Sequence, residues 1–298
     1  MPPSRVAIIG VGLIGGSLAR ALKRAGERVT GYDTDPLVLR RASEIGVIDE
    51  PCAHLCGAVE GAEIVVLAVP LGAVPGVFQG LAGSLDGHAV ITDVGSVKGS
   101  VVHAARRYLG HHLPRFVPGH PIAGTEHSGV ENSCAGLFHG QRVILTPLAE
   151  TDPRALERVR WLWQQTGAVV EDMEIGQHDQ VFAATSHLPH VLAYALVRAA
   201  ARVSGRSALL RYAAGGFADI TRIASSNPVM WRDIFFANRV RLIEMIERFR
   251  EDLALLRDAI EAEDGPAVVA FLEEAKNTRD ALAAEQRIGP DLVGEKKR

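Results

Sequence analysis

The sequence lacks both an excess of charge and a cysteine framework. Its 298 residues include 32 Lys and Arg against 35 Asp and Glu, which leaves a formal net charge of -3. Such a chain has no general attraction for nucleic acid or for an anionic membrane. The cysteines Cys52, Cys56 and Cys134 are odd in number, and the C-x3-C spacing of the first two suits neither a disulfide set nor a usual zinc site. We therefore expect reduced thiols and a small-molecule ligand.

Long apolar runs and a targeting segment are also missing. No stretch approaches the roughly 20 apolar residues needed to cross a bilayer, and the start "MPPSRVAIIG" leads directly into a strand pattern. It has none of the charged, apolar and cleavage regions of a signal peptide. These absences favour a cytoplasmic protein without membrane contact. The length allows two domains, each with a core of its own.

The pattern of β-branched runs changes along the chain. In the first half such runs alternate with helical patterns: "RVAIIG", "RVTGYD", "EIVVLAVP", "AVITDVGS", "RVILTP" and "GAVVEDM". This alternation predicts a doubly wound parallel sheet with helices on both faces. After Met173 we find no further strand pattern, and helical patterns continue almost to the end. We expect an α/β domain over residues 1–173 and an all-α domain over residues 174–298.

One segment of the second half has a clear apolar stripe. Its apolar residues are spaced by 3, 4, 3 and 4 positions, with charged residues between them: Ile246, Phe249, Leu253, Leu256 and Ile260. This spacing predicts an amphipathic helix that must bury one face. A helical domain of this size often completes its core with a second copy, so we expect a homodimer. A monomer whose helices cover one another is the alternative.

A glycine-rich turn follows the first expected strand. Gly10, Gly12 and Gly15 stand in G-x-G-x-x-G register between a strand and a helix, the setting of the Rossmann dinucleotide fingerprint. The N–H groups at the start of that helix, where Leu13 and Ile14 lie, would meet the charge of a pyrophosphate. The first half is therefore predicted to be a Rossmann-type domain.

An acidic residue indicates which dinucleotide binds. Asp33 ends the second expected strand, where a carboxylate can accept hydrogen bonds from the adenosine ribose hydroxyls. It would repel the 2'-phosphate of NADP, and Thr34 and Asp35 follow it where an NADP enzyme more often has a cation. We therefore expect NAD as the cofactor. Val69 and Pro70, at the end of "EIVVLAVP", are further expected contacts.

The stretch "GHPIAGTEHSG" is the candidate catalytic segment. His120 is expected in a loop beyond a short strand, next to Pro121 and Gly124, at the edge where doubly wound sheets bind ligands. Its imidazole has the intrinsic pKa of a general base. Ser96, in the loop of "DVGSVK", is expected near the nicotinamide and could fix the tautomer of His120. The structural alternative is that His120 ends a strand and Glu126 caps the next turn.

The helical half holds two more clusters of polar residues. "ATSHLPH" places His187 and His190 near an expected helix start, and "GGFADITRIASSNPVMWRDI" contains Arg222, whose planar fork suits a carboxylate. An ion pair between Arg222 and Asp219 is the alternative. A metal site made from these histidines with His178 or Asp179 is disfavoured, because the spacing is not H-E-x-x-H and no thiol accompanies it.

Taken together and in order, these segments resemble one family. "GLIGGSLA", "DVGSVK", "GHPIAGTEHSG", "ATSHLPH" and "GGFADITRIASSNPVMWRDI" cover most of the chain and are similar to prephenate dehydrogenase, the tyrosine-pathway family that includes arogenate and cyclohexadienyl dehydrogenases. The resemblance implies oxidative decarboxylation of prephenate to 4-hydroxyphenylpyruvate, CO2 and NADH.

The resemblance also implies residue roles. His120 would take the proton of the ring C4 hydroxyl, Ser96 would orient His120 and the cofactor, and Arg222 would bind a substrate carboxylate. The remaining positions that match the family near the substrate are His190, Thr125, Glu126, Ser186, His187, Gly215, Asp219 and Trp231.

Other functions stay open at this point. Arogenate or both substrates could be used in place of prephenate, because the choice depends on a few pocket groups. A β-hydroxyacid or imine-reducing dehydrogenase with a helical domain is a second enzyme class, although Lys276 is the only lysine of the helical half before the tail. A catalytically silent NAD-binding sensor is the alternative outside the enzymes.

Overall fold

The computed structural model describes residues 4–124 and 127–288, without the side chains of 204–210, 212 and 285–288. The chain forms two compact units, residues 1–242 and 243–298. The change from mixed to helical structure expected at residue 173 lies between the last strand, which ends at Asp172, and a helix that begins at Ile175. The first unit nevertheless continues to Leu242, because the next helices pack against the sheet-bearing part.

A six-stranded parallel sheet forms the centre of the first unit, as the sequence predicts. Its strand order is β3-β2-β1-β4-β5-β6, and every pair is parallel. The order reverses between β1 and β4, and ligands bind at such a switch point in doubly wound sheets. The strands are β1 (Arg5–Ile9), β2 (Arg28–Tyr32), β3 (Glu50–Pro51), β4 (Ile64–Leu67), β5 (Val90–Asp93) and β6 (Phe116–Val117).

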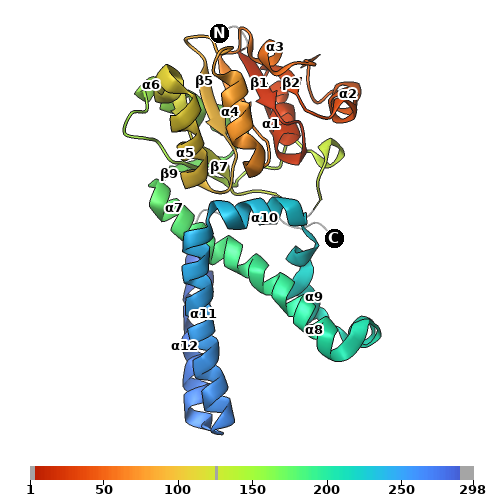
Figure 1. The fold of residues 1–298 in the computed structure, drawn as a ribbon, viewed down its shortest axis with the longest axis vertical. Coiled ribbons are helices and arrows are strands. Elements are labelled where there is room, and N and C mark those ends of the chain that lie inside the picture. Colours follow the sequence, from red (N-terminus) through yellow and green to blue (C-terminus); the bar gives the residue numbers. More distant parts are fainter. Residues whose placement is uncertain (1–3, 125–126, 289–298) are drawn as a thin grey trace. The chain divides into compact units, whose positions relative to one another are not determined.

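Helices cover both faces of this sheet (Figure 1). Alternate residues of a strand point to opposite faces, so Val6 and Ile8 of β1 join one buried cluster and Ala7 and Ile9 join the other. The first cluster includes residues of α1 (Leu13–Arg24), α2 (Pro36–Glu44) and α6 (Pro153–Gln164), and the second includes residues of α3 (Leu55–Val59), α4 (Val74–Leu81) and α5 (Lys98–Tyr108). Short helical turns η1 (Leu71–Ala73), η2 (Gly110–Arg115) and η3 (Val130–Asn132) lie in the connections.

A second, smaller sheet departs from the prediction. The run "RVILTP" was expected in the large parallel sheet, but β8 (Arg142–Leu145) pairs antiparallel with β7 (Gly119–Pro121) and parallel with β9 (Val169–Asp172). The chain leaves the large sheet after β6 at Pro118, which has no N–H to continue a ladder. The Pro118 carbonyl instead accepts a hydrogen bond from Thr146 N–H at the end of β8.

The helical part of the first unit begins with one nearly continuous run. It comprises α7 (Ile175–Phe182), a π-helical turn η4 (Ala183–His187) and α8 (Leu188–Tyr212). The sequence predicted a helix start near His187, and the structure shows a π turn inside a longer helix instead. Pro189 has no N–H to donate to the carbonyl four residues earlier, and π turns often mark such points and functional sites. The segments that follow are α9 (Gly215–Thr221), η5 (Arg222–Ser225) and α10 (Pro228–Ala237).

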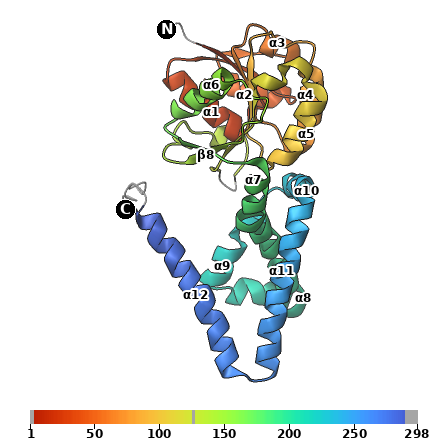
Figure 2. The ribbon, with the colours of Figure 1, turned by 90° about the vertical axis from the view of Figure 1, so that its left-hand side faces the viewer.

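Two long helices extend through the second unit, α11 (Arg239–Glu261) and α12 (Gly265–Ile288) (Figure 2). The predicted amphipathic helix is present within α11. Its apolar stripe is only partly covered, since Leu253 is 49% and Ile260 is 59% exposed. Across the described residues, no helix has the length and apolarity that a membrane span requires.

Trp163 of α6 gives a test of the core. It is fully buried and packs edge-on against Phe138, with ring centroids 5.3 Å apart. Trp163→Ala should lower the free energy of unfolding by about 3–5 kcal/mol, the usual range for a buried large-to-small change. Urea unfolding followed by circular dichroism measures this. Trp161→Ala, on the partly exposed side of the same helix, should cost clearly less, and equal losses would contradict the packing described.

Candidate functional site

The glycine-rich turn between β1 and α1 is built to admit a ligand. Gly10 has a φ of 93°, and a Cβ there would lie 2.4 Å from the carbonyl oxygen of Ala68. A Cβ on Gly15 would lie 2.0 Å from the carbonyl oxygen of Gly10. At Gly12, by contrast, a Cβ would meet no atom of the described residues within 4 Å. Two of the glycines therefore serve tight packing, and the third faces open space.

The start of α1 offers hydrogen-bond donors to that space. Among the described residues no side chain caps this helix, so its first N–H groups, where Leu13 and Ile14 lie, remain available to an anion. Asp33 stands beside the turn and accepts a hydrogen bond from Val11 N–H at 2.9 Å. The β4 loop adjoins the turn, because Val69 lies 3.0 Å from a Cβ built on Gly10 and Pro70 follows. The predicted cofactor contacts thus gather at the switch point, and they fit a dinucleotide.

His120 lies in a strand, which corrects the prediction of a loop. It is the middle residue of β7 and pairs with Ile144 of β8. Its neighbour Gly119 approaches the end of β5 closely, since a Cβ there would lie 3.0 Å from the Asp93 carbonyl oxygen. The Gly119 N–H also donates to Asp93 Oδ1 at 3.2 Å. The backbone that carries the imidazole is therefore held against the large sheet.

A buried ammonium group completes that attachment. The side chain of Lys98, in the first turn of α5, is fully buried, and its Nζ lies 2.5 Å from Asp93 Oδ2 and 2.5 Å from the Gly119 carbonyl oxygen. Burial lowers the pKa of Lys98, whereas the adjacent Asp93 acts in the opposite direction. One side chain thus links β5, α5 and β7 beneath His120.

The hydrogen-bond partner of His120 is another histidine. Its Nδ1 lies 2.9 Å from Nε2 of His178, and Nδ1 of His178 lies 2.8 Å from Oδ1 of Asp179. Ser96 was expected to fix the tautomer of His120, but the described residues contain no hydrogen bond between them. Ser96 is partly exposed in the turn between β5 and α5. Sequence reasoning considered His178 and Asp179 only as unfavoured metal ligands, although an adjacent His–Asp pair in the first helix after the last strand is a usable signal.

Asp179 is in turn bound to the start of α5. Its Oδ1 accepts the N–H of Lys98 and its Oδ2 accepts the N–H of Gly99, each at 2.8 Å. Burial acts to raise the pKa of Asp179, but the hydrogen bond from His178 and the two backbone N–H groups outweigh it and lower that pKa. Asp179 is therefore a carboxylate with its charge well satisfied.

The imidazoles of His120, His178 and His187 all have pKa values below the ordinary histidine value, which favours their neutral forms at pH 7. Burial, followed by the neighbouring His178 and Lys98, holds the pKa of His120 well below its ordinary value. Burial also lowers the pKa of His178, against the opposing effect of Asp179. For His187 burial lowers the pKa to about 4. A neutral imidazole with a free nitrogen is the form that can accept a proton.

A second cluster adjoins the first through Asn238. Its amide nitrogen donates to the Asp179 carbonyl at 2.7 Å and to Nδ1 of His187 at 3.2 Å. Trp231 follows, with its ring centroid 6.2 Å from that of His187 and stacked 3.5 Å from that of His190. Within the described residues, the buried Nε2 of His187 and Nε1 of Trp231 have no hydrogen-bond partner. Unpaired buried donors are costly, and they suit a ligand with acceptor oxygens.

Arg222 borders this second cluster. It is exposed at the start of η5, and its charge contributes to lowering the pKa of His190, after the larger effect of burial. The Ser186 carbonyl accepts a hydrogen bond from His190 Nδ1 at 2.9 Å. The contacts therefore run from His120 to His190, and Arg222 lies close enough for its charge to act on His190.

Other predicted substrate residues are less well placed. Gly215 is exposed at the start of α9. Thr125 and Glu126 lie outside the described residues. No group of three or more His, Cys, Asp or Glu side chains in the described ranges is arranged to hold a metal ion.

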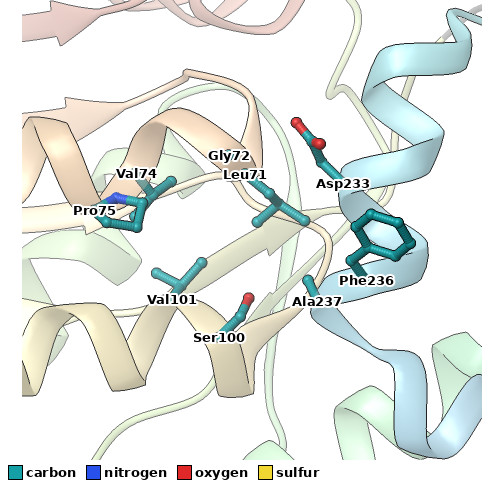
Figure 3. A pocket seen from close by; sticks show the side chains of 9 residues that line it. All are labelled: Leu71, Gly72, Val74, Pro75, Ser100, Val101, Asp233, Phe236 and Ala237. Atoms are coloured by element: carbon teal, nitrogen blue, oxygen red, sulfur yellow. The ribbon is translucent and has the colours of Figure 1, made fainter.

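A small cavity lies beside the second cluster and not within it. It has a volume of about 190 Å³ and is lined by residues of η1, α4, α5 and α10 (Figure 3): Leu71, Gly72, Val74, Pro75, Ser100, Val101, Asp233, Phe236 and Ala237. None of the predicted site residues lines it. Leu71 and Ala237 also pack against the buried core of Val97, Trp231 and Ile234. The cavity therefore lies next to the apolar core that contains Trp231.

Comparison with known proteins gives a consistent result. Residues 18–172 match the family model of the prephenate dehydrogenase nucleotide-binding domain, and residues 175–274 match that of the prephenate dehydrogenase dimerization domain. The chain is 39% identical to the cyclohexadienyl dehydrogenase of Zymomonas mobilis over 292 residues. The matched region covers 96% of this chain and 98% of the relative.

Solved structures are similar over almost the whole chain. One is the prephenate dehydrogenase of Aquifex aeolicus in complex with hydroxyphenyl propionate and NAD+, with 40% identity, a TM-score of 0.88 and coverage of 95% of this chain and 99% of that chain. Another is the arogenate dehydrogenase of Synechocystis, with 28% identity, a TM-score of 0.79 and coverage of 93% and 99%.

Gly12 gives a test of the nucleotide site. Because a Cβ at this position meets only open space, Gly12→Ala should leave the thermal midpoint of the ligand-free protein unchanged and raise the Kd for NAD by about tenfold or more, the equivalent of one blocked phosphate contact. Calorimetric titration measures the Kd. Gly87→Ala, before β5 at the opposite edge of the sheet, is the control and should bind NAD normally. Unweakened binding by Gly12→Ala would place the pyrophosphate elsewhere.

Proposed function

Because the chain belongs to the prephenate dehydrogenase family, we propose that it catalyses the NAD-dependent oxidative decarboxylation of prephenate to 4-hydroxyphenylpyruvate. The observation that carries this proposal is the unbroken series of contacts from His120, on β7 beside the carboxyl end of β5, to His190 and Trp231 in the helical part. Such a series brings a base and an anion-binding cluster to one region of the molecule.

His120 is the base in this proposal. Its Nδ1 is engaged by His178, which leaves Nε2 for the substrate. Nε2 takes the proton of the ring C4 hydroxyl, and it returns that proton to the same oxygen as the ring carboxylate leaves as CO2. NAD supplies the hydride acceptor for C4 when it is bound. The net change is one hydride transferred and one C–C bond broken, with the ring made aromatic.

The helical cluster would bind the negative charges of the substrate. Prephenate is a dianion, and the chain has a net charge of -3, so local groups must supply the attraction. Arg222 offers a planar fork for a carboxylate. The ring nitrogens of His187 and Trp231 that lack a partner among the described residues are further donors in this cluster.

Arogenate is the second candidate substrate. The similarity to proteins named cyclohexadienyl dehydrogenase and arogenate dehydrogenase supports this alternative. Prephenate has a keto group in its side chain where arogenate has an amino group, so the two differ only at the end remote from C4. Dual use of both substrates is compatible with the same base and the same carboxylate-binding groups.

The protein would act as a homodimer. Large apolar side chains remain exposed on both helices of the second unit: Leu253, Leu255, Ile260, Val269, Leu272 and Leu282. Exposed apolar side chains in this number mark an interaction surface, and the matched family domain is described as a dimerization domain. Burial of this face in a second copy would complete the helical core.

The proposed function is tested by initial rates. NADH absorbance should rise with prephenate and NAD, and parallel assays with L-arogenate and with NADP define the preferences. His120→Asn should lower kcat by about two to four orders of magnitude, the contribution of a general base, and leave the Kd for NAD unchanged. Turnover of neither substrate by the wild-type protein would refute the function, and near-normal kcat in His120→Asn would refute the base.

Arg222 is tested separately. Arg222→Ala should raise the KM for prephenate by about tenfold to a hundredfold, because a charge-assisted hydrogen bond of about 1.5–3 kcal/mol is lost, with a smaller effect on kcat. Arg222→Lys keeps the positive charge but loses the planar fork, so its KM should lie between those of the wild-type protein and Arg222→Ala. Arg106→Ala, an exposed arginine paired with Glu150, is the control. An unchanged KM in Arg222→Ala would remove this residue from the carboxylate site.

A further inference from the structure

We propose that His178 and Asp179 are positioning residues, which fix the tautomer of His120 with Nε2 free and stabilise its charge once it has taken up a proton. The inference deepens the proposed function and rests on His120 as its base. It concerns two residues that the sequence analysis did not assign to the reaction. The geometry of these residues determines which atom donates and which accepts in each hydrogen bond between Asp179, His178 and His120.

The direction follows from Asp179. A carboxylate can only accept hydrogen bonds, so Nδ1 of His178, 2.8 Å from Oδ1, must carry a hydrogen. A neutral His178 then has an unprotonated Nε2, which can only accept. Nδ1 of His120, 2.9 Å away, must therefore donate. The neutral His120 that results has its lone pair on Nε2, the nitrogen directed away from His178.

The carboxylate itself is fixed by the start of α5. Three hydrogen bonds reach its two oxygens, from His178 and from the N–H groups of Lys98 and Gly99. The positive end of the helix dipole favours a negative charge at this position. Gly99 is needed for the close approach, because a Cβ there would lie 2.8 Å from Asp179 Oδ2. Asp179 therefore cannot rotate to offer His178 a different partner.

Phe182 shields the two imidazoles. Its ring centroid lies 4.7 Å from that of His120 and 4.5 Å from that of His178, one turn along the same helix. The apolar ring covers one side of the contact between the imidazoles, and a hydrogen bond is stronger beside an apolar group than in water. When Nε2 takes the substrate proton, an O–H bond breaks and an N–H bond forms. The new positive charge on His120 faces the His178 lone pair, with the Asp179 charge behind it.

Other charged and titratable groups around His120 do not replace this function. Lys98 of α5 and His187 of η4 act against a positive charge on His120. Asp93 of β5 is already paired with Lys98. Asp179 of α7 is linked to His120 through the imidazole of His178, which is hydrogen-bonded to both residues. Among the described residues, Asp179 is the carboxylate that is connected to His120 in this way.

The tautomer is measured directly by NMR of protein labelled with 15N-histidine. Long-range correlations show which ring nitrogen carries the proton, and His120→Asn assigns the signals. In the wild-type protein His120 should have a protonated Nδ1 and an unprotonated Nε2. His178→Leu removes the acceptor and should give a mixture of tautomers. His178→Gln restores an acceptor oxygen and should restore the single tautomer.

The kinetic measurement is the pH profile of kcat/KM. Asp179→Asn removes a negative charge, so the base becomes weaker: the acid limb should move to lower pH, and kcat should fall by about a hundredfold, within the range of a general base. The KM for NAD should stay unchanged. Gly99→Ala displaces the same carboxylate without removing it and should shift the limb in the same direction by less. Glu171→Gln, which removes an exposed carboxylate of β9 paired with Arg142, is the control and should change neither property.

Each outcome decides the inference. A protonated Nε2 on His120 in the wild-type protein, or a single tautomer that persists in His178→Leu, would overturn it. An acid limb that stays at the same pH in both Asp179→Asn and Gly99→Ala would also overturn it. If the two residues served only the stability of the fold, the variants would yield less folded protein, but the pH of the acid limb would not shift. Should the wild-type protein oxidise neither prephenate nor arogenate, the proposed function fails, and the tautomer measurement still decides whether the two residues position His120.

Discussion

The contact between the Lys98 ammonium group, Asp93 and the Gly119 carbonyl is the constraint on which the site depends. A charge that is fully buried costs several kcal/mol unless its partners are in place, so the end of β5, the start of α5 and β7 must assemble together. Gly119 carries His120 as its neighbour, and the Lys98 N–H holds Asp179. One residue of the nucleotide-binding part thus determines where the base and its partner lie.

Much of the nucleotide site follows from local patterns in the sequence. Gly10 and Gly15 are recognisable because strand, turn and helix follow one another within a few residues, and Asp33 ends the adjacent strand. The alternation of apolar runs predicts the parallel sheet because each buried strand needs apolar residues on both faces. Arg222 was singled out because its planar fork suits a carboxylate, whereas His190 and Trp231 were expected near the substrate from the family resemblance.

Long-range pairing accounts for what the sequence did not predict. Strand β7 has only three residues and pairs with β8 more than twenty residues away, which no local periodicity encodes. For the same reason His178 and not Ser96 is the partner of His120, since His178 lies 58 residues from His120 along the chain. The π turn before Pro189 is another such case, because helical propensity does not distinguish it from a helix start.

The position of His120 in a paired strand has a consequence for the catalytic cycle. A residue on a mobile loop can be withdrawn while product leaves, whereas the backbone of β7 is held by β8 on one side and by Asp93 and Lys98 on the other. Moving this backbone away would require breaking the hydrogen bonds of Gly119 to Lys98 and Asp93. Entry of substrate and departure of product must therefore be accommodated by segments other than the one that bears the base.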